Sequence, residues 1–270
     1  RDVAAVIKDL SKYPFAVLRA VNTWFNALMN NPDFAKLDFS KLKVALGGGM
    51  SVQKAIAERF EKITGTPLLE AYGLSETSPF ATANPVNTKG FTGYIGLPVC
   101  STDIVMLDDD GHPVPHGEPG EICIKGPQVM RDYWGRPDET AKAMTADGYF
   151  KTGDIGIMND QGYIKIVDRK KDMILVSGFN VYPNEIEDIA VRHSKVLEAA
   201  AIGIEDDYSG EAVKLFVVKR DGSLTESELK DFLKESLTNY KRPKVIEFIG
   251  ELPKSNVGKI LRKDLRKPKA

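Results

Sequence analysis

Several short segments of this sequence carry side chains that suit nucleotide chemistry. The first, residues 71–79, combines an aromatic ring, a glycine, hydroxyls and a carboxylate. An aromatic ring offers its face to a flat heterocycle, hydroxyls donate to phosphate oxygens, and a carboxylate is a hard oxygen ligand for Mg²⁺. A polar turn after a strand would use the same residues, and spacing alone favours that simpler interpretation. The residues in question are Tyr72, Gly73, Ser75, Glu76 and Thr77.

Two charged positions further along fit the binding of a sugar or a phosphate. Asp154 ends the run Tyr-Phe-Lys-Thr-Gly-Asp, and a carboxylate has enough acceptor sites for both hydroxyls of a ribose. An Asp after a Gly more often bonds to its own backbone in a turn, which is the favoured interpretation of this position alone. Arg169 lies in the charged run of residues 168–172, which fits either a solvated linker or a hinge whose arginine reaches a sugar or phosphate.

A lysine near the C-terminus follows a glycine and suits phosphate. Lys259, on a turn with Gly258, can meet a phosphate as a mobile point charge, whereas the simpler interpretation is a basic tail. The segment is not a Walker loop, because Ile260 stands where a Ser or Thr is required. Glycines fill residues 47–49 and can bring backbone close to a ligand at a helix N-terminus, but they lack the spacing of a dinucleotide-binding loop.

The elements that must position these residues begin with an α/β pattern in residues 1–92. Short apolar runs predict strands at residues 15–21, 44–46 and 68–71. A helix is expected after Ser51, which can cap it, and its apolar side chains recur at helical spacing on one face. Those side chains are Ile56, Phe60 and Ile63.

The residue composition changes after residue 92. From there to residue 167, dense Gly and Pro interrupt short apolar runs, and we expect a β-barrel-like subdomain. Residues 168–172 are expected to form a hinge or linker, and residues 173–270 a small α+β domain. Its expected elements are helices at 183–192 and 225–240, the second with a capping box of Thr225 and Glu228, and strands at 199–204 and 213–218.

The composition is that of a globular protein, with 42% hydrophobic and 28% charged residues. The formal net charge of −1 argues against a protein coated with base for binding nucleic acid. No apolar run approaches the length of about 20 residues that a membrane span needs. Cys100 and Cys123 lack zinc-binding spacing and are expected to be buried free thiols, with one disulfide as the alternative.

Taken together and in order, the segments resemble the adenylate-forming enzymes, a superfamily that includes acyl-CoA synthetases, peptide-synthetase adenylation domains and firefly luciferase. The resemblance covers nearly the whole chain, and residues 22–28 and 177–183 are most similar to bacterial long-chain-fatty-acid–CoA ligases. Members are much longer and carry a phosphate loop in their first half that has no counterpart here, so we expect the C-terminal half of such an enzyme. The segments that carry the resemblance are residues 72–79, 120–130, 133–140, 151–154, 168–174, 177–187 and 253–262.

The resemblance implies roles in a two-step reaction. A carboxylate attacks the α-phosphate of ATP, and the thiol of coenzyme A then takes the acyl group. By the resemblance, adenine meets Tyr72, with the backbone of Gly48 and Gly49 nearby. Glu76 binds Mg²⁺, and Lys259 makes the central catalytic contact by bridging the substrate carboxylate and the α-phosphate. The other implied nucleotide contacts are those of Gly73, Ser75 and Thr77, of Asp154 with the ribose, and of Arg169 with the sugar or a phosphate.

The resemblance also places Lys171 at a hinge about which the small domain rotates between the two half-reactions. One pose presents Lys259, and the other presents Ser177 and Gly178, where the pantetheine arm of coenzyme A enters. A glycine suits a narrow tunnel because it has no side chain.

The expected function is therefore that of a fatty acyl-CoA ligase that uses ATP, Mg²⁺ and coenzyme A, with this chain inactive alone. The alternatives are a ligase for an aryl or medium-chain acid, and a non-catalytic fragment that binds a nucleotide or a protein. We expect a cytoplasmic enzyme, a homodimer in its full-length form, without a nucleic-acid partner. Its lipid substrate is compatible with peripheral contact at the inner membrane.

Overall fold

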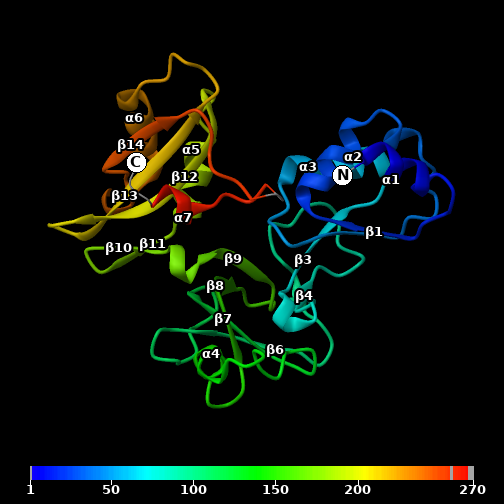
Figure 1. Cartoon of the computed structure of the whole chain (residues 1–270), viewed down its shortest axis with the longest axis horizontal. Helices are drawn as coiled ribbons and strands as arrows, with labels where there is room; N and C mark the ends of the chain where they lie inside the picture. The colour runs from blue at the N-terminus through cyan, green and yellow to red at the C-terminus, as the bar shows by residue number, and fades with distance from the viewer. Residues whose placement is uncertain (1, 256–257, 267–270) are drawn as a thin grey trace. The chain divides into compact units, whose positions relative to one another are not determined.

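The strands predicted in residues 1–92 form one sheet in the computed structural model (Figure 1). The strands are β1 (Val17–Ala20), β2 (Val44–Gly47), β3 (Leu68–Tyr72), β4 (Thr82–Ala83) and β5 (Leu97–Pro98). The helices are α1 (Val3–Leu10), α2 (Asn22–Asn30) and α3 (Lys54–Thr64), with 3₁₀ turns η1 (Phe34–Lys36) and η2 (Ser75–Thr77). β1, β2 and β3 run parallel, and α2 and α3 supply the crossovers that parallel neighbours need. β4 and β5 continue the sheet in antiparallel fashion.

Helix faces packed on this sheet form its core. Phe25 of α2 and Phe60 of α3 are fully buried, and their ring centroids lie 5.1 Å apart at a steep angle. Burying one such side chain contributes about 1.5–3 kcal/mol. The predicted helix face is confirmed, but the predicted cap at Ser51 is wrong. The helix begins at Lys54, and the N–H of Gln53 donates to the side chain of Asn22 at 3.1 Å.

The predicted β-rich part is an open sheet rather than a closed barrel. Its strands, in the order β6-β7-β8-β9, are β6 (Asp103–Leu107), β7 (Pro119–Lys125), β8 (Phe150–Met158) and β9 (Ile164–Arg169), with helix α4 (Pro137–Ala143) before β8. At the edge strand β9, Ile164 exchanges hydrogen bonds with the backbone of residues 95 and 96. Asp154 lies within β8 and is buried, so the turn favoured for it from local sequence is wrong.

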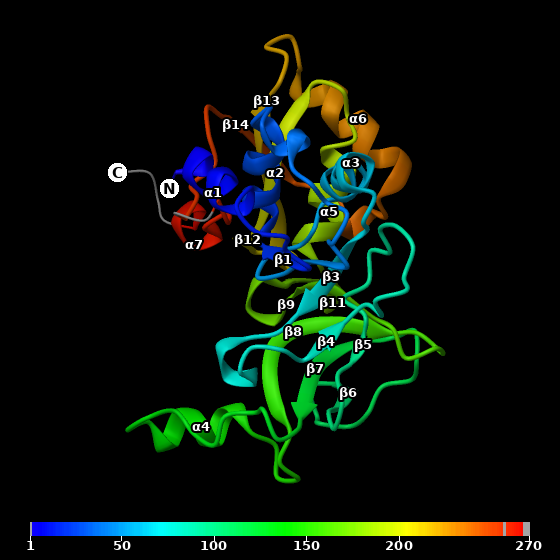
Figure 2. The same cartoon turned by 90° about the vertical axis from the view of Figure 1, so that its right-hand side faces the viewer.

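A third sheet organises the C-terminal part. Its strands are β10 (Ile174–Val176), β11 (Phe179–Val181), β12 (Val196–Asp206), β13 (Gly210–Lys219) and β14 (Val245–Ile249). The helical elements are α5 (Pro183–Ala190), α6 (Glu226–Ser236) and α7 (Arg262–Leu265), with 3₁₀ turns η3 (Lys170–Asp172) and η4 (Asn239–Lys241). Successive side chains of β12 and β13 point to opposite faces of the sheet, and both faces are covered. Helices α5 and α6 pack on one face (Figure 2). Leu252, Ile260 and Leu265 pack on the other.

The long helix of this part has the predicted N-cap, but the Glu228 carboxylate of the predicted capping box pairs with Lys195, and the helix ends early. Thr225 is the N-cap, and its Oγ1 accepts a hydrogen bond from the N–H of Glu228 at 3.2 Å. The helix was expected to reach residue 240 and instead ends at Ser236. Arg242 accounts for the difference, because its guanidinium donates to the carbonyls of Leu237 and Lys234 at 2.9 and 3.1 Å. These donors satisfy carbonyls that a helix end leaves unpaired.

The structure describes residues 2–255 and 258–266 and divides into two units. The first comprises Arg1–Thr152 and Gly156–Ile166, and the second comprises Gly153–Ile155 and Val167–Ala270. Asn256 and Val257, which belong to the motif around Lys259, and the end of the predicted domain 173–270 lie outside the described residues.

Two sequence expectations concern thiols and membranes. Cys100 and Cys123 form no disulfide, as expected, but Cys100 is exposed rather than buried. Within residues 2–255 and 258–266, no helix has the length and apolar character needed to span a membrane.

Candidate active site

The Tyr72 segment leaves β3 and turns back tightly on itself. A Cβ atom on Gly73 would lie 1.6 Å from the carbonyl oxygen of Pro79, so only glycine fits there. The hydroxyl of Thr77 is fully buried, accepts from the N–H of Leu74 at 2.9 Å and donates to the carbonyl of Pro79 at 3.0 Å. Thr77 therefore holds the loop in shape, and its contact with a phosphate stays a prediction.

Glu76 and Tyr133 meet beside this loop. The Tyr133 hydroxyl donates to Oε1 of Glu76 at 2.9 Å, and the N–H of Met130 donates to the Glu76 carbonyl at 2.7 Å. Burial raises the pKa of Tyr133, and the Glu76 carboxylate raises it further, so the phenol remains a donor. The sequence gives no sign of this contact, because 57 residues separate Tyr133 from Glu76.

The glycines after β2 lie against the start of the same loop. A Cβ atom on Gly48 would be 3.3 Å from the carbonyl oxygen of Ala71, the residue before Tyr72. Gly49 has a φ of 73°, a left-handed conformation that favours glycine. The structure therefore brings the predicted glycine backbone and the predicted adenine-binding tyrosine into one neighbourhood.

An ion pair joins the two residues predicted to meet the ribose. The Nε of Arg169 lies 2.7 Å from Oδ1 of Asp154, and their side chains are 38% and 4% exposed. The Asp154 carboxylate is therefore fixed on a strand, and the arginine that holds it reaches solvent. Such a pair offers acceptors and donors side by side, which is what a sugar hydroxyl or a phosphate requires.

Lys259 is exposed, and its predicted catalytic contact stays a prediction. The turn is closed by the N–H of Ser255, which donates to the Lys259 carbonyl at 2.8 Å, and by the Lys259 N–H, which donates to Oγ of Ser255 at 3.2 Å. Partial desolvation lowers the pKa of Lys259, and the positive charge of Arg169 lowers it further, while Asp154 opposes both. Lys259 therefore shares one electrostatic environment with the Asp154–Arg169 pair.

The charged run 168–172 is only partly solvated. Lys171, the predicted hinge residue, is exposed within η3, whereas Asp168 and Asp172 are 1% and 8% exposed. The interpretation of the run as a solvated linker is therefore wrong for its two aspartates. Ser177 and Gly178 form the exposed turn between β10 and β11, with φ values of 50° and 83°.

The predicted residues thus fall into two groups, one in each unit. The first unit holds Gly48, Gly49, Tyr72, Gly73, Ser75, Glu76 and Thr77. The second unit holds Asp154, Arg169, Lys171, Ser177, Gly178 and Lys259.

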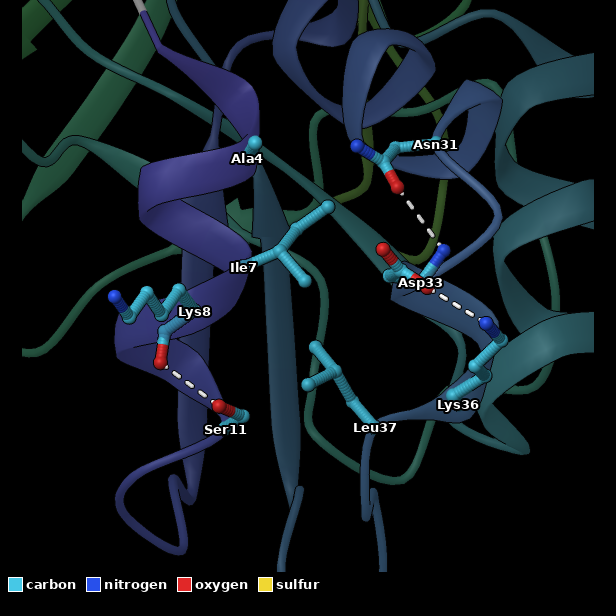
Figure 3. A pocket seen from close by; sticks show the side chains of 8 residues that line it. All are labelled: Ala4, Ile7, Lys8, Ser11, Asn31, Asp33, Lys36 and Leu37. Carbon is cyan, nitrogen blue, oxygen red and sulfur yellow. Dashed lines mark hydrogen bonds and ion pairs between the residues drawn. The ribbon is translucent and has the colours of Figure 1, made fainter.

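A separate pocket lies between α1 and the segment after α2 (Figure 3). Its polar side chains bond locally, since Lys36 Nζ lies 2.7 Å from Oδ1 of Asp33 and the N–H of Asp33 donates to Asn31. None of the predicted site residues lines it. The lining residues are Ala4, Ile7, Lys8, Ser11, Asn31, Asp33, Lys36 and Leu37.

Comparisons with known proteins agree with one another. The AMP-binding enzyme family matches residues 1–134, and the C-terminal domain of AMP-binding enzymes matches residues 185–259. A long-chain-fatty-acid–CoA ligase of Yersinia pestis is 58% identical over 98% of this chain and 47% of its own length. The ligase of the same name from Escherichia coli O157:H7 is 56% identical with the same coverage. The chain thus spans about half the length of these relatives.

A solved structure supports the same relationship at the level of the fold. The crystal structure of ATP-bound MatB from Rhodopseudomonas palustris is 30% identical, with a TM-score of 0.88. It matches 98% of this chain and 53% of its own length. The α/β and α+β organisation predicted from sequence is therefore that of adenylate-forming enzymes.

Proposed function

Since the chain belongs to the AMP-binding enzyme family, we propose that it is the C-terminal part of a long-chain-fatty-acid–CoA ligase. The whole enzyme would convert a fatty acid to an acyl-adenylate with ATP and then to a thioester with coenzyme A. One observation supports the chemistry: the ammonium group of Lys259 is exposed and interacts electrostatically with the Asp154–Arg169 pair. The identity of 58% to a ligase of that name supports the fatty acid as substrate.

In the first half-reaction, a carboxylate oxygen of the fatty acid attacks the α-phosphorus. The new O–P bond replaces the bond to the bridging oxygen, and pyrophosphate leaves with that electron pair. Negative groups must approach one another, so a cation between them lowers the barrier. We assign this role to Lys259, whose ammonium group would bridge the carboxylate and the α-phosphate.

Each predicted nucleotide contact is proposed for the whole enzyme. Tyr72 would stack on adenine beside the backbone of Gly48 and Gly49, and Asp154 would accept the ribose hydroxyls. Ser75, which is exposed, would donate to a phosphate oxygen. Arg169 would keep its bond to Asp154 and add a donor for the sugar or a phosphate.

Glu76 fits a Mg²⁺ ion that arrives with ATP. Mg²⁺ bound to a nucleotide takes only one or two protein carboxylates and fills its remaining positions with phosphate oxygens and water. A single half-buried carboxylate, steered by Tyr133, matches that requirement. When bound, Mg²⁺ would offset the charge that develops on pyrophosphate.

In the second half-reaction, the thiolate of coenzyme A attacks the acyl carbon and AMP leaves. We propose that rotation about Lys171 replaces Lys259 with the turn of Ser177 and Gly178. Both φ values in that turn are positive, which gives a tight, exposed backbone corner beside which the pantetheine arm would pass.

Lys259→Ala in the full-length enzyme tests the central assignment. Acyl-adenylate formation, followed by ATP–pyrophosphate exchange, should fall by about 10²–10³-fold, the usual cost of losing a donor to developing charge. Thioester formation from supplied acyl-adenylate should remain close to that of the wild type. Lys230→Ala, which removes an exposed ion pair with Glu226 on α6, is the matched control. Equal loss of both half-reactions would contradict the role of Lys259.

A panel of acids tests the substrate class. We expect the highest kcat/KM for long-chain fatty acids such as oleate, lower values for octanoate and the lowest for benzoate. A preference for benzoate would favour the aryl-acid alternative. Titration calorimetry of this chain with ATP and AMP would show whether it binds nucleotide by itself. The cytoplasmic location, peripheral membrane contact and homodimer also remain predictions.

A further inference from the structure

A buried ion pair anchors the segment that follows Lys259. Arg262, the first residue of α7, donates through Nη2 to both carboxylate oxygens of Glu187, at 2.8 and 2.9 Å, and through Nε to Oε1 at 3.2 Å. Its Nη2 also donates to Oδ1 of Asn184 at 2.8 Å. The side chains of Arg262 and Glu187 are only 13% and 12% exposed. A guanidinium that bonds both oxygens of a carboxylate fixes orientation as well as distance.

Glu187 is itself fixed on the core of the second unit. It lies on α5, and its Oε1 accepts a hydrogen bond from the N–H of Ala201 at 2.7 Å. Ala201 belongs to β12, which ends the strand order of this sheet, so Glu187 satisfies an N–H at the sheet's edge. Arg262 is thereby tied to a helix and a strand that cannot move independently of the core.

The same cluster binds the charged run of residues 168–172, which precedes β10 in the chain. Asp172 lies 3.7 Å from Nη1 of Arg262 and 2.9 Å from Nη2 of Arg266. Asp168 accepts hydrogen bonds from the N–H of Asn184 at 2.8 Å and of Arg169 at 2.7 Å. The backbone of Arg169, the partner of Asp154, is therefore fixed next to the element that carries Glu187.

The segment that carries Lys259 leads directly into this anchor. On its N-terminal side the turn is held by bonds between residues 253–255 and 259–261, and on its C-terminal side by Arg262, three positions after Lys259. Burial by itself lowers the pKa of Arg262, but the charges of Glu187, Asp168 and Asp172 outweigh burial and raise it. Arg262 thus stays charged at every pH at which the enzyme works.

We propose that Arg262 is a positioning residue for adenylate formation. Through Glu187 and Asp172 it fixes the Lys259 turn relative to Asp154 and Arg169, so that the ammonium group meets the nucleotide in one geometry. The proposal rests on the proposed function of Lys259. It makes a distinct statement, because it concerns how the lysine is held rather than what the lysine does.

The test uses the full-length enzyme with two substitutions of Arg262. Arg262→Lys keeps the charge but cannot bond both oxygens of Glu187, and Arg262→Met removes the charge. We expect acyl-adenylate formation at saturating ATP to fall about tenfold in the first variant and about 100-fold in the second, because small misplacements of catalytic groups cost that much. Thioester formation from supplied acyl-adenylate should stay within about twofold of the wild type.

The matched control is Lys241→Met. Lys241 lies 2.7 Å from Glu185, so this variant removes another ion pair to α5 without touching the Lys259 turn. Both half-reactions should be unchanged in it. If Arg262→Met does not fold, Glu187→Gln, which keeps the shape of the side chain, should give the same selective loss.

Two results would overturn the proposal. One is adenylate formation at the wild-type rate in Arg262→Lys and Glu187→Gln. The other is an equal loss of both half-reactions with a lowered Tm, which would mean a purely structural role. Lys259→Ala distinguishes failure of the positioning role from failure of the proposed function. If Lys259→Ala still forms adenylate at the wild-type rate, the proposed function of Lys259 is wrong. If Lys259→Ala selectively loses adenylate formation while the Arg262 variants keep it, only the positioning role is wrong.

Discussion

Lys259 combines exposure with an electrostatic setting that weakens its proton affinity. Desolvation and the charges of Arg169 and Lys171 lower its pKa, and Asp154 and Asp172 only partly oppose them. The resemblance of the segment around Lys259 to a family motif is what points to this lysine in the sequence. It could not reveal this setting, because Asp154 and Arg169 are far from Lys259 along the chain.

The pH dependence of adenylate formation should reflect the lowered pKa of Lys259. Since the proposed role of Lys259 needs the protonated amine, the rate should fall on the alkaline side at a pH below the ordinary lysine value of 10.5. Arg169→Gln removes a neighbouring positive charge, so its residual rate should fall at a higher pH than that of the wild type. Rates of ATP–pyrophosphate exchange across pH would check both. An alkaline limb at or above 10.5 in the wild type would contradict the lowered pKa.

Tyr133 should tune the binding of Mg²⁺ by Glu76. Tyr133→Phe removes the hydrogen bond that orients the carboxylate, and the loss of such an outer partner typically weakens metal binding about tenfold or more. We expect the Mg²⁺ concentration for half-maximal adenylate formation to rise by about that factor. Tyr163→Phe is the control, because the Tyr163 ring packs against Tyr94, with 6.3 Å between the ring centroids. An unchanged Mg²⁺ dependence in Tyr133→Phe would show that the bond does not position Glu76.

At the scale of the elements, regular periodicity was predictable and long-range contacts were not. The strands near residues 15–21, 44–46 and 68–71 are confirmed because their apolar runs are local signals. Asp154 was misjudged, since Gly153 before it suggested a turn, although Phe150, Thr152 and Asp154 alternate inward along a strand. Only Phe150 among these inward residues is apolar, so the sequence of residues 150–154 shows no apolar–polar alternation that would indicate a strand.

Gly73 sets the shape of the loop that follows β3. In Gly73→Ala the new Cβ would overlap the carbonyl oxygen of Pro79, so the loop must shift and lose the bonds of Thr77. We expect the free energy of unfolding of the first unit to fall by about 3 kcal/mol, at the upper end for overpacking. Urea unfolding measures it, with Gly222→Ala, whose Cβ meets open space, as control. A loss no larger than that of Gly222→Ala would mean that the loop adapts freely.

At the scale of the whole molecule, two units predict two unfolding events. Calorimetry of this chain should show separate transitions, and Gly73→Ala should lower the temperature of only one, because Gly73 belongs to the first unit. A single transition whose calorimetric and van't Hoff enthalpies agree would contradict independent units.

The family could be predicted from the order of the motifs, because each motif alone is weak but their sequence along the chain is specific. The roles of Tyr133, Glu187 and Arg262 could not, since each depends on a partner brought close only by folding. The acyl chain length leaves no signal among the motifs that carry the chemistry.

The discontinuity of the second unit matters for anyone who wants to isolate or exchange it. A gene fragment that opens after Ile166 would omit residues 153–155, and with them the carboxylate to which Arg169 is bonded. Such a fragment would leave the Arg169 guanidinium without the carboxylate that neutralises it. Swapping this lobe between relatives therefore calls for an extra pair of crossover points that carry the short insert of β8 along with it.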